Sequence, residues 1–175
     1  MQRSCIILCG GGGKTTLAKQ FPAIVADIDE LVKRNENRRR LINYYFTQNN
    51  VSGISEVYRD AMLTDATIQN DSRIILLHRP GDAKILRRTI LGIFRPSLTL
   101  HDRNISERSF YHQQLSRNDW ERLSEYDTIE FDSYPINAVL DILSVKSDHP
   151  CELQSDRIDP DLIGGAPNPM GTQSN

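Results

Sequence analysis

Several features that mark special classes of protein are scarce in this 175-residue chain. Only three cysteines occur, Cys5, Cys9 and Cys151, and their number and spacing fit neither a disulfide framework nor a zinc site. We therefore expect reduced thiols, which are typical of a cytoplasmic protein. No apolar stretch approaches the roughly 20 residues that cross a bilayer, and the run at 5–9 is too short for a signal peptide. The sequence thus predicts a cytoplasmic protein without a membrane partner.

An excess of charge of one sign is also absent. Lysine and arginine number 21 against 23 acidic residues, for a net charge of −2. This balance argues against a broad electrostatic grip on nucleic acid, although a local basic patch stays possible. The length suits one domain, which we place at 1–146. From residue 147 the chain is rich in proline and glycine without periodicity, which predicts a disordered or loosely docked tail at 147–175.

Strand-like and helix-like segments alternate along the chain. Apolar runs predict strands at 4–9, 23–29, 72–80 and 128–135. Helical spacing predicts helices at 14–21, 30–46, 51–69, 81–94, 109–127 (broken near 116–118) and 136–144, with a polar connection at 95–108. This order predicts an α/β fold, in which helices cover both faces of a mostly parallel sheet. Ligands bind beyond the carboxyl ends of strands in such sheets.

The stretch "LCGGGGKTT" at 8–16 lies between the first strand and the first helix. Glycine lets backbone N–H groups turn toward a phosphate and removes the Cβ atoms that would block it. In a phosphate-binding loop the lysine reaches the β- and γ-phosphates and the hydroxyl binds Mg²⁺. The predicted nucleotide-binding residues are Gly10, Gly11, Gly12, Gly13, Lys14, Thr15 and Thr16. One position departs from the signature, because Leu8 stands where its leading glycine is expected.

With its strand and helix, "IILCGGGGKTTLAKQF" resembles the start of the P-loop kinases of small substrates. These include nucleoside monophosphate, shikimate, gluconate and polynucleotide kinases, and "DIDELVKR" at 27–34 strengthens the resemblance. It covers residues 4–34 and rests on element order beyond them. The resemblance implies a P-loop NTPase-type three-layer sandwich with ATP and Mg²⁺ as cofactors. It also implies phosphoryl transfer to a small acceptor.

Asp27 and Asp29 are two residues apart, so on an extended strand both point to the same side. In the resembling families the first acid serves the metal or acts as base, and the second contacts substrate. The sequence leaves open which residue does which, and it leaves open that Asp29 is a plain helix cap. The third strand ends in His78 and Arg79 rather than in a Walker-B acid, which argues against a motor-type or switch-type ATPase. A lone strand-end histidine such as His78 is more often structural.

Kinases of this type close an arginine-bearing lid over the phosphates, since guanidinium groups neutralise charge on the transferring group. The candidates are Arg87, Arg88, Arg95, Arg103 and Arg108. We predict the lid in "HDRNISER", with Arg103 and Arg108 as its catalytic arginines, although solvated arginines on helices are common. A second basic cluster, Arg38 to Arg40, fits either a solvated helix face or a polynucleotide backbone.

Three functional hypotheses follow. The favoured one is ATP-dependent phosphoryl transfer to a nucleotide or nucleoside. The alternatives are a polynucleotide 5′-hydroxyl kinase, with a nucleic-acid acceptor, and a nucleotide-binding module without transferase activity. The sequence names neither the acceptor nor the oligomeric state.

Overall fold

The computed structural model describes residues 3–132 and residue 139. The elements of the first part are, in chain order, β1 (Ser4–Leu8), α1 (Lys14–Gln20), β2 (Val25–Asp27), α2 (Ile28–Lys33), α3 (Glu36–Thr47), α4 (Val51–Thr64), α5 (Ala66–Gln69), β3 (Ile74–Leu77), α6 (Pro80–Ile85), β4 (Thr89–Pro96), α7 (Leu98–Ile105), α8 (Phe110–Leu123) and β5 (Ile129–Phe131).

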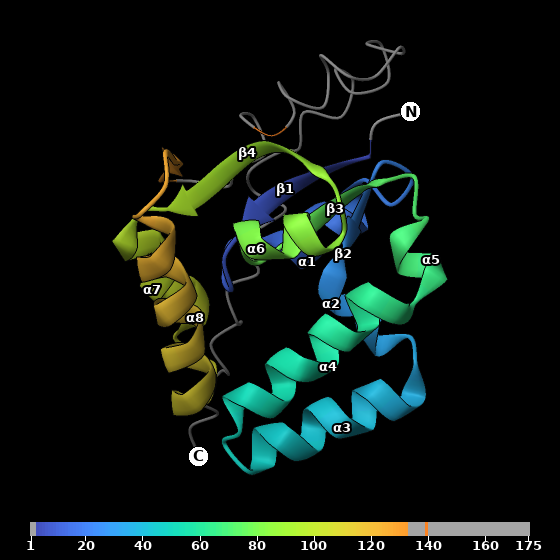
Figure 1. Cartoon of the computed structure of the whole chain (residues 1–175). Coiled ribbons are helices and arrows are strands. Elements are labelled where there is room, and N and C mark those ends of the chain that lie inside the picture. Colours follow the sequence, from blue (N-terminus) through green and yellow to red (C-terminus); the bar gives the residue numbers. More distant parts are fainter. Residues whose placement is uncertain (1–2, 133–138, 140–175) are drawn as a thin grey trace, which may run out of the picture. The chain divides into compact units, whose positions relative to one another are not determined.

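The five strands form one all-parallel sheet in the order β2-β3-β1-β4-β5 (Figure 1). The predicted α/β class with a mostly parallel sheet is therefore confirmed. The chain passes from β1 outward to β2 and then returns through β3 to the other side of β1. The strand order thus reverses between β1 and β3, and the crevice at such a reversal is where open parallel sheets bind ligands.

The central strand β1 is buried on both of its faces. Its side chains alternate, so Cys5 and Ile7 lie on one face and Ile6 and Leu8 on the other, and all four are inaccessible to solvent. The face of Cys5 and Ile7 belongs to a core that also takes buried residues from α2 to α6 and α8. Leu17 of α1 is buried outside that core, as expected if α1 covers the opposite face through a right-handed crossover. Helices therefore cover both faces of β1.

Of the helices between β2 and β3, α3 and α4 pack against each other as a pair. Figure 1 shows α3 and α4 running side by side, with α7 and α8 on the opposite flank of the carboxyl edge of the sheet. The end of α3 reaches the start of α8, since the rings of Phe46 and His112 lie 4.2 Å apart. The two flanks therefore face each other across the strand ends.

The predicted helix at 81–94 is wrong over its second half. Helix α6 ends at Ile85, Arg87 adopts a left-handed φ of 51°, and β4 begins at Thr89. A left-handed residue cannot continue a helix. Ile93 and Phe94 then pair with Ile7 and Leu8 of β1, which fits their β-forming side chains.

Three further predictions differ from the structure. The strand predicted at 23–29 is β2, which ends at Asp27, so Asp29 lies in the first turn of α2 and the two acids do not share a strand. The polar connection at 95–108 contains α7, whose start is capped by Ser97 accepting a hydrogen bond from the Leu100 N–H. The predicted break near 116–118 does not occur, since α8 runs unbroken to Leu123.

The predicted helix at 136–144 and the tail at 147–175 lie outside the described residues, Val139 apart, so the boundary at 146 stays a prediction. Within residues 3–132 and at 139, we find no helix with both the length and the apolar character needed to cross a membrane.

At the amino edge of the sheet, Arg88 connects the starts of several elements. Its side chain is nearly inaccessible, at 6% exposure. The guanidinium donates to the carbonyl oxygens of Ser4, Ile68, Asp71 and Arg73, at 2.7 to 3.3 Å. Burying a cation is costly unless its donors are satisfied, and here four carbonyls accept from the two terminal nitrogens, while the buried Nε has no partner among the described residues. Arg88, which precedes β4, is therefore a structural arginine at the opposite end of the sheet from the glycine loop.

We predict that Arg88→Met lowers the free energy of unfolding by about 3 kcal/mol or more, because buried carbonyls would lose charged donors. Urea denaturation measures the change. Arg87→Met is the matched control, since Arg87 is exposed and its replacement should stay within about 0.5 kcal/mol. Equal stability of the two variants would contradict the structural role of Arg88.

Candidate active site

The glycine loop follows β1 directly and turns back on itself before α1. The Gly12 N–H donates to the Cys9 carbonyl at 3.0 Å, and Gly11 and Gly13 have positive φ values of 82° and 89°. The left-handed turns therefore lie at Gly11 and Gly13, two conformations that glycine adopts without strain. Leu8, which replaces the leading glycine of the signature, is the buried last residue of β1. The loop turns sharply without a glycine at that position.

Gly10 and Gly12 are required for space rather than for φ. A Cβ atom on Gly10 would lie 2.9 Å from the Ser116 hydroxyl oxygen of α8. On Gly12 it would lie 2.9 Å from the Cys9 carbonyl oxygen, which is rigid backbone. Such distances are shorter than real side-chain contacts allow. The loop is thus closely packed and is no flexible glycine tract.

Helix α7 holds this loop from outside. The His101 ring bonds to the Gly10 carbonyl through Nε2 at 2.9 Å, and the Asn104 amide donates to the Gly11 carbonyl at 3.0 Å. Burial lowers the pKa of His101. A neutral ring therefore donates to Gly10. The region predicted as a lid is, in this structure, a support for the glycine loop.

The side chain of Lys14 lies against the loop and is only 5% exposed. Its ammonium group donates to the carbonyls of Leu8 and Cys9, each at 3.4 Å, and lies 3.2 Å from Nδ1 of His78. Lys14 is thus the one lysine among residues 3–132 that is buried.

The thiol of Cys9 lies beside the same site. Burial raises its pKa to about 12, so Cys9 is no nucleophile near neutral pH.

Thr15 and Asp27 form a direct pair behind the loop. The Thr15 hydroxyl donates to Oδ2 of Asp27 at 2.8 Å, and Oδ1 of Asp27 accepts the Asp29 N–H at 3.0 Å as the cap of α2. Asp27 is 1% exposed. Burial, followed by the charge of Asp29, raises the pKa of Asp27. A buried carboxylate of this kind is stabilised by a nearby cation.

Asp29 lies on the other side of the site with three polar neighbours. Oδ1 of Asp29 is 2.8 Å from Nε2 of His78 and accepts the Tyr58 hydroxyl at 2.7 Å. Burial would raise the pKa of Asp29, but His78, Lys14 and Tyr58 outweigh it and hold the pKa well below its usual value. Asp29 therefore stays ionised where Asp27 resists ionisation. The structure thus separates two carboxylates that the sequence could not tell apart.

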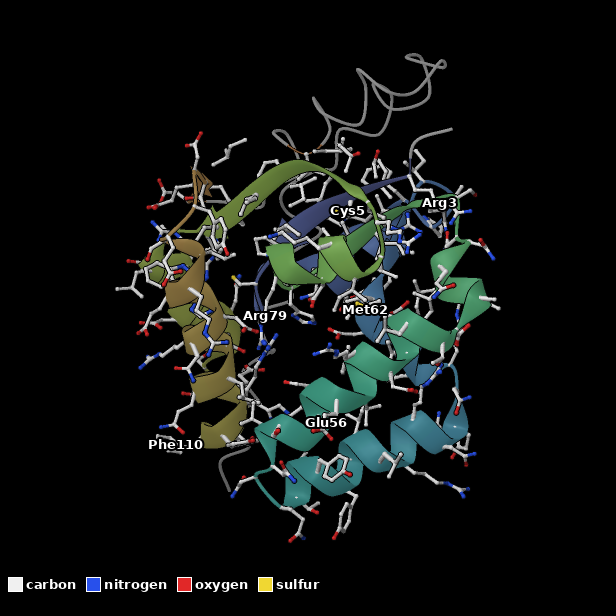
Figure 2. The ribbon with its side chains drawn as sticks, in the orientation of Figure 1. Arg3, Cys5, Glu56, Met62, Arg79 and Phe110 are labelled. Atoms are coloured by element: carbon white, nitrogen blue, oxygen red, sulfur yellow. The ribbon has the colours of Figure 1, made fainter. Side chains whose placement is uncertain are left out.

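A cavity of about 650 Å³ lies over these groups, between the loop, α4 and α8. Lys14, Thr15, Asp29 and His78 line it, whereas Asp27 does not. Its apolar wall comes from α3, α4, α6 and α8 and includes Phe46, Ile54, Tyr58, Met62, Ile85 and Leu115. Figure 2 shows Arg79, from the end of β3, in the space between α4 and α8.

The predicted arginines occupy different places. Arg108 lines the cavity and donates to the Ser116 hydroxyl at 3.0 Å. Arg103 lies in the last turn of α7, is exposed and does not line the cavity. Arg79 lines it and pairs with Asp119 at 2.8 Å.

The cluster at Arg38 to Arg40 does not line the cavity. Arg38 pairs with Asp65, which lies between α4 and α5. Arg39 and Arg40 both pair with Glu36, one turn earlier in α3. These three arginines therefore form a structural and surface ion-pair cluster.

Of the two oxygen ligands predicted for Mg²⁺, Thr15 lines the cavity, whereas Asp27 is buried and does not line it. Mg²⁺ is commonly held by one or two protein oxygens together with phosphates and water. Thr15 and Asp27 supply such oxygens in direct contact. Within residues 3–132 and at 139, we find no cluster of three or more histidine, cysteine or acidic side chains that could bind a metal. The donor set fits an ion that binds together with phosphates.

Several functional side chains were missed by sequence reasoning. Tyr58 and Asp119 carry no local signal, because helices far apart in sequence bring them to the cavity. The contact between His78 and Lys14 depends on β3 pairing directly beside β1. Alternation of strands and helices gives the parallel sheet but not which strands are neighbours.

No family model matches the sequence, and no similar protein was found among curated proteins or solved structures. The site is therefore interpreted from its own geometry.

We predict that Asp27→Asn keeps or raises the melting temperature at pH 7. Burial raises the pKa of Asp27 in the folded protein above its value of about 3.9 in the unfolded chain. The contribution of Asp27 to folding stability therefore falls as the pH rises above about 3.9. The amide removes that charge, so any gain should shrink as the pH approaches 4. Thermal unfolding from pH 4 to 8 measures this.

Asp29→Asn should behave in the opposite way. The low pKa of Asp29 means that its ionised form stabilises the fold above about pH 3.9, and that this is lost as pH falls further. We expect a loss of about 1–3 kcal/mol at pH 7, since two donors lose a charged acceptor. If both variants shifted in the same direction at pH 7, the assignment of distinct environments would be wrong.

Proposed function

We propose that this protein is an ATP-dependent P-loop phosphotransferase that acts on a small acceptor, a nucleoside or nucleotide. One observation carries the proposal. The glycine loop, Lys14, Thr15 and the ionised Asp29 line one cavity where the strand order reverses, and the buried Asp27 is joined to this group by its hydrogen bond with Thr15. The all-parallel sheet and the helices on both faces of β1 support a P-loop NTPase-type sandwich. The unpaired, buried thiols of Cys5 and Cys9 support the cytoplasmic location that is part of the proposal.

The donor nucleotide would bind on the loop side of the cavity. Amides of Gly11 to Thr16 would surround the phosphates, and Lys14 would neutralise charge on the β- and γ-phosphates. Gly13 precedes α1 without a side-chain cap, and no acidic residue lies in the first turn, so nothing there repels an anion. Thr15 and Asp27 would hold Mg²⁺, which when bound offsets phosphate charge.

The acceptor would bind on the α3–α4 side. Asp29 has an ionised carboxylate to accept a hydrogen bond from an acceptor hydroxyl and so to orient it. The apolar wall with Phe46, Ile54 and Tyr58 supports an acceptor with a base-sized, planar group rather than a bare polyol. Lys33 and Arg59 also line the cavity and would favour an acceptor with negative charge.

The transferring phosphoryl group carries its charge on oxygens that arginine fits well. Arg108 is the candidate that lines the cavity, and Arg79 is a second one that the sequence prediction did not include. We propose that these two, rather than Arg103, face the transferring group.

The alternative of a polynucleotide kinase is less well supported. Its basic groove was expected from Arg38 to Arg40, whose guanidinium groups are occupied by Asp65 and Glu36. A steep fall of substrate affinity with salt would nevertheless favour it.

We predict that Lys14→Ala lowers ATP turnover, measured as ADP release over a panel of nucleosides, nucleotides and a 5′-hydroxyl oligonucleotide, by about 10²–10³-fold. The reason is the loss of a cation that meets the phosphates. Lys19→Ala is the matched control, since Lys19 lies on the same helix but is exposed and does not line the cavity.

Unchanged turnover in Lys14→Ala would contradict the proposal. Binding of ATP by the unaltered protein, without acceptor-dependent ADP release from any member of the panel, would instead support a nucleotide-binding module without transferase activity.

A further inference from the structure

A continuous hydrogen-bonded chain joins the donor side of the site to the acceptor side. It runs from the Lys14 ammonium to Nδ1 of His78 at 3.2 Å, and from Nε2 of His78 to Asp29 at 2.8 Å. Tyr58 completes it by donating to the same oxygen of Asp29. His78 thus contacts both Lys14 and Asp29.

The chemistry of the groups fixes the direction of these bonds. An ammonium group has donors only, so Nδ1 of His78 accepts from Lys14. Nε2 then carries the ring hydrogen and donates it to Asp29, which suits a carboxylate that stays ionised. Each of the two ring nitrogens of His78 therefore has one defined partner.

Each N–H group of the Lys14 ammonium has an acceptor nearby. The ammonium has three N–H groups and three acceptors in contact, namely the carbonyls of Leu8 and Cys9 and the ring of His78. The two carbonyl contacts are long for hydrogen bonds, and a phosphate that binds the ammonium from the cavity would replace the acceptor on that side. Leu8 and Cys9 do not line the cavity, whereas His78 does. The acceptor that an entering phosphate would replace is therefore His78.

We infer that His78 is a positioning residue that holds Lys14 while the donor site is empty and gives it up when nucleotide binds. Through this exchange the ring keeps its bond to Asp29, so the acceptor carboxylate stays oriented while the donor lysine moves. The inference rests on the proposed function, because it requires phosphate at Lys14. It assigns to His78 a role that strand-end position alone does not give.

Removal of an ordinary binding residue lowers the affinity for the ligand, whereas the exchange at His78 predicts the opposite effect. Removing the acceptor at His78 should raise the affinity for nucleotide, because the empty protein then loses a bond that binding would break anyway. We expect His78→Leu to bind the Mg²⁺ complex of the β,γ-imido analogue of ATP about three- to tenfold more tightly. Isothermal titration calorimetry measures the affinity.

Two control variants leave the acceptor for Lys14 in place. His78→Asn keeps an oxygen close to the place of Nδ1 and should bind the analogue with the affinity of the unaltered protein. Tyr58→Phe removes a donor to Asp29 without touching Lys14, so it too should leave the affinity unchanged within about twofold. Equal or weaker affinity in His78→Leu would overturn the inference.

A measurement on the unaltered protein covers the case in which His78→Leu fails to fold. Nitrogen-15 spectra of the histidine side chains, with His78→Asn for assignment, report Nδ1 directly. On addition of the analogue we expect the Nδ1 signal to shift together with the amides of Gly11 to Lys14. If the amides shift and Nδ1 does not, the inference is wrong and the proposed donor site stands. If neither shifts, the proposed donor site is wrong, and the inference with it.

Discussion

The burial of the Lys14 ammonium inside the glycine loop is the constraint on which the rest of the site depends. A charge taken out of water costs several kcal/mol unless hydrogen bonds and opposite charge compensate it. The carbonyls of Leu8 and Cys9 and the ring of His78 compensate it here. Asp29, which is bonded to the other side of the His78 ring, supplies the opposite charge. The loop must therefore close tightly around the lysine, and the glycines make that closure possible. His78 and Lys14 hold the pKa of Asp29 well below its usual value, whereas burial and the charge of Asp29 raise the pKa of Asp27 although Lys14 opposes them.

Sheet topology brings these groups together. Because β3 pairs between β1 and β2, the residues that follow it reach the loop after β1 and the carboxylates after β2. Helices α7 and α8 then pack on the loop from the far side, through His101, Asn104 and Ser116. The loop is held between two layers of structure, so its shape exists before any ligand binds. A site of fixed shape avoids the ordering cost that a flexible loop would meet on binding.

Much of this site could be predicted from the sequence because its strongest signals are local. The glycines, Lys14 and Thr15 follow a short apolar run, and the two acids end the next one, so spacing alone indicates a phosphate site in a parallel sheet. What failed depends on distant partners. The region 81–94 has helical spacing, and only pairing with β1 makes its second half a strand. Arg103 and Arg108 are similar in sequence context, but Arg103 lies within α7 and does not line the cavity, whereas Arg108 follows that helix and does. His78 gains its role from two partners, 64 and 49 residues away in the chain.

The central claim is that Lys14 and Asp29 face the two ends of a phosphoryl transfer across one cavity. A crystal structure with Mg²⁺ and the β,γ-imido analogue of ATP tests this most directly. We predict that the γ-phosphate lies within hydrogen-bonding distance of the Lys14 ammonium. Asp29 should face the unoccupied part of the cavity, on the side away from the nucleotide. A triphosphate bound elsewhere, with Lys14 still bonded to His78 and the loop carbonyls, would contradict the central claim.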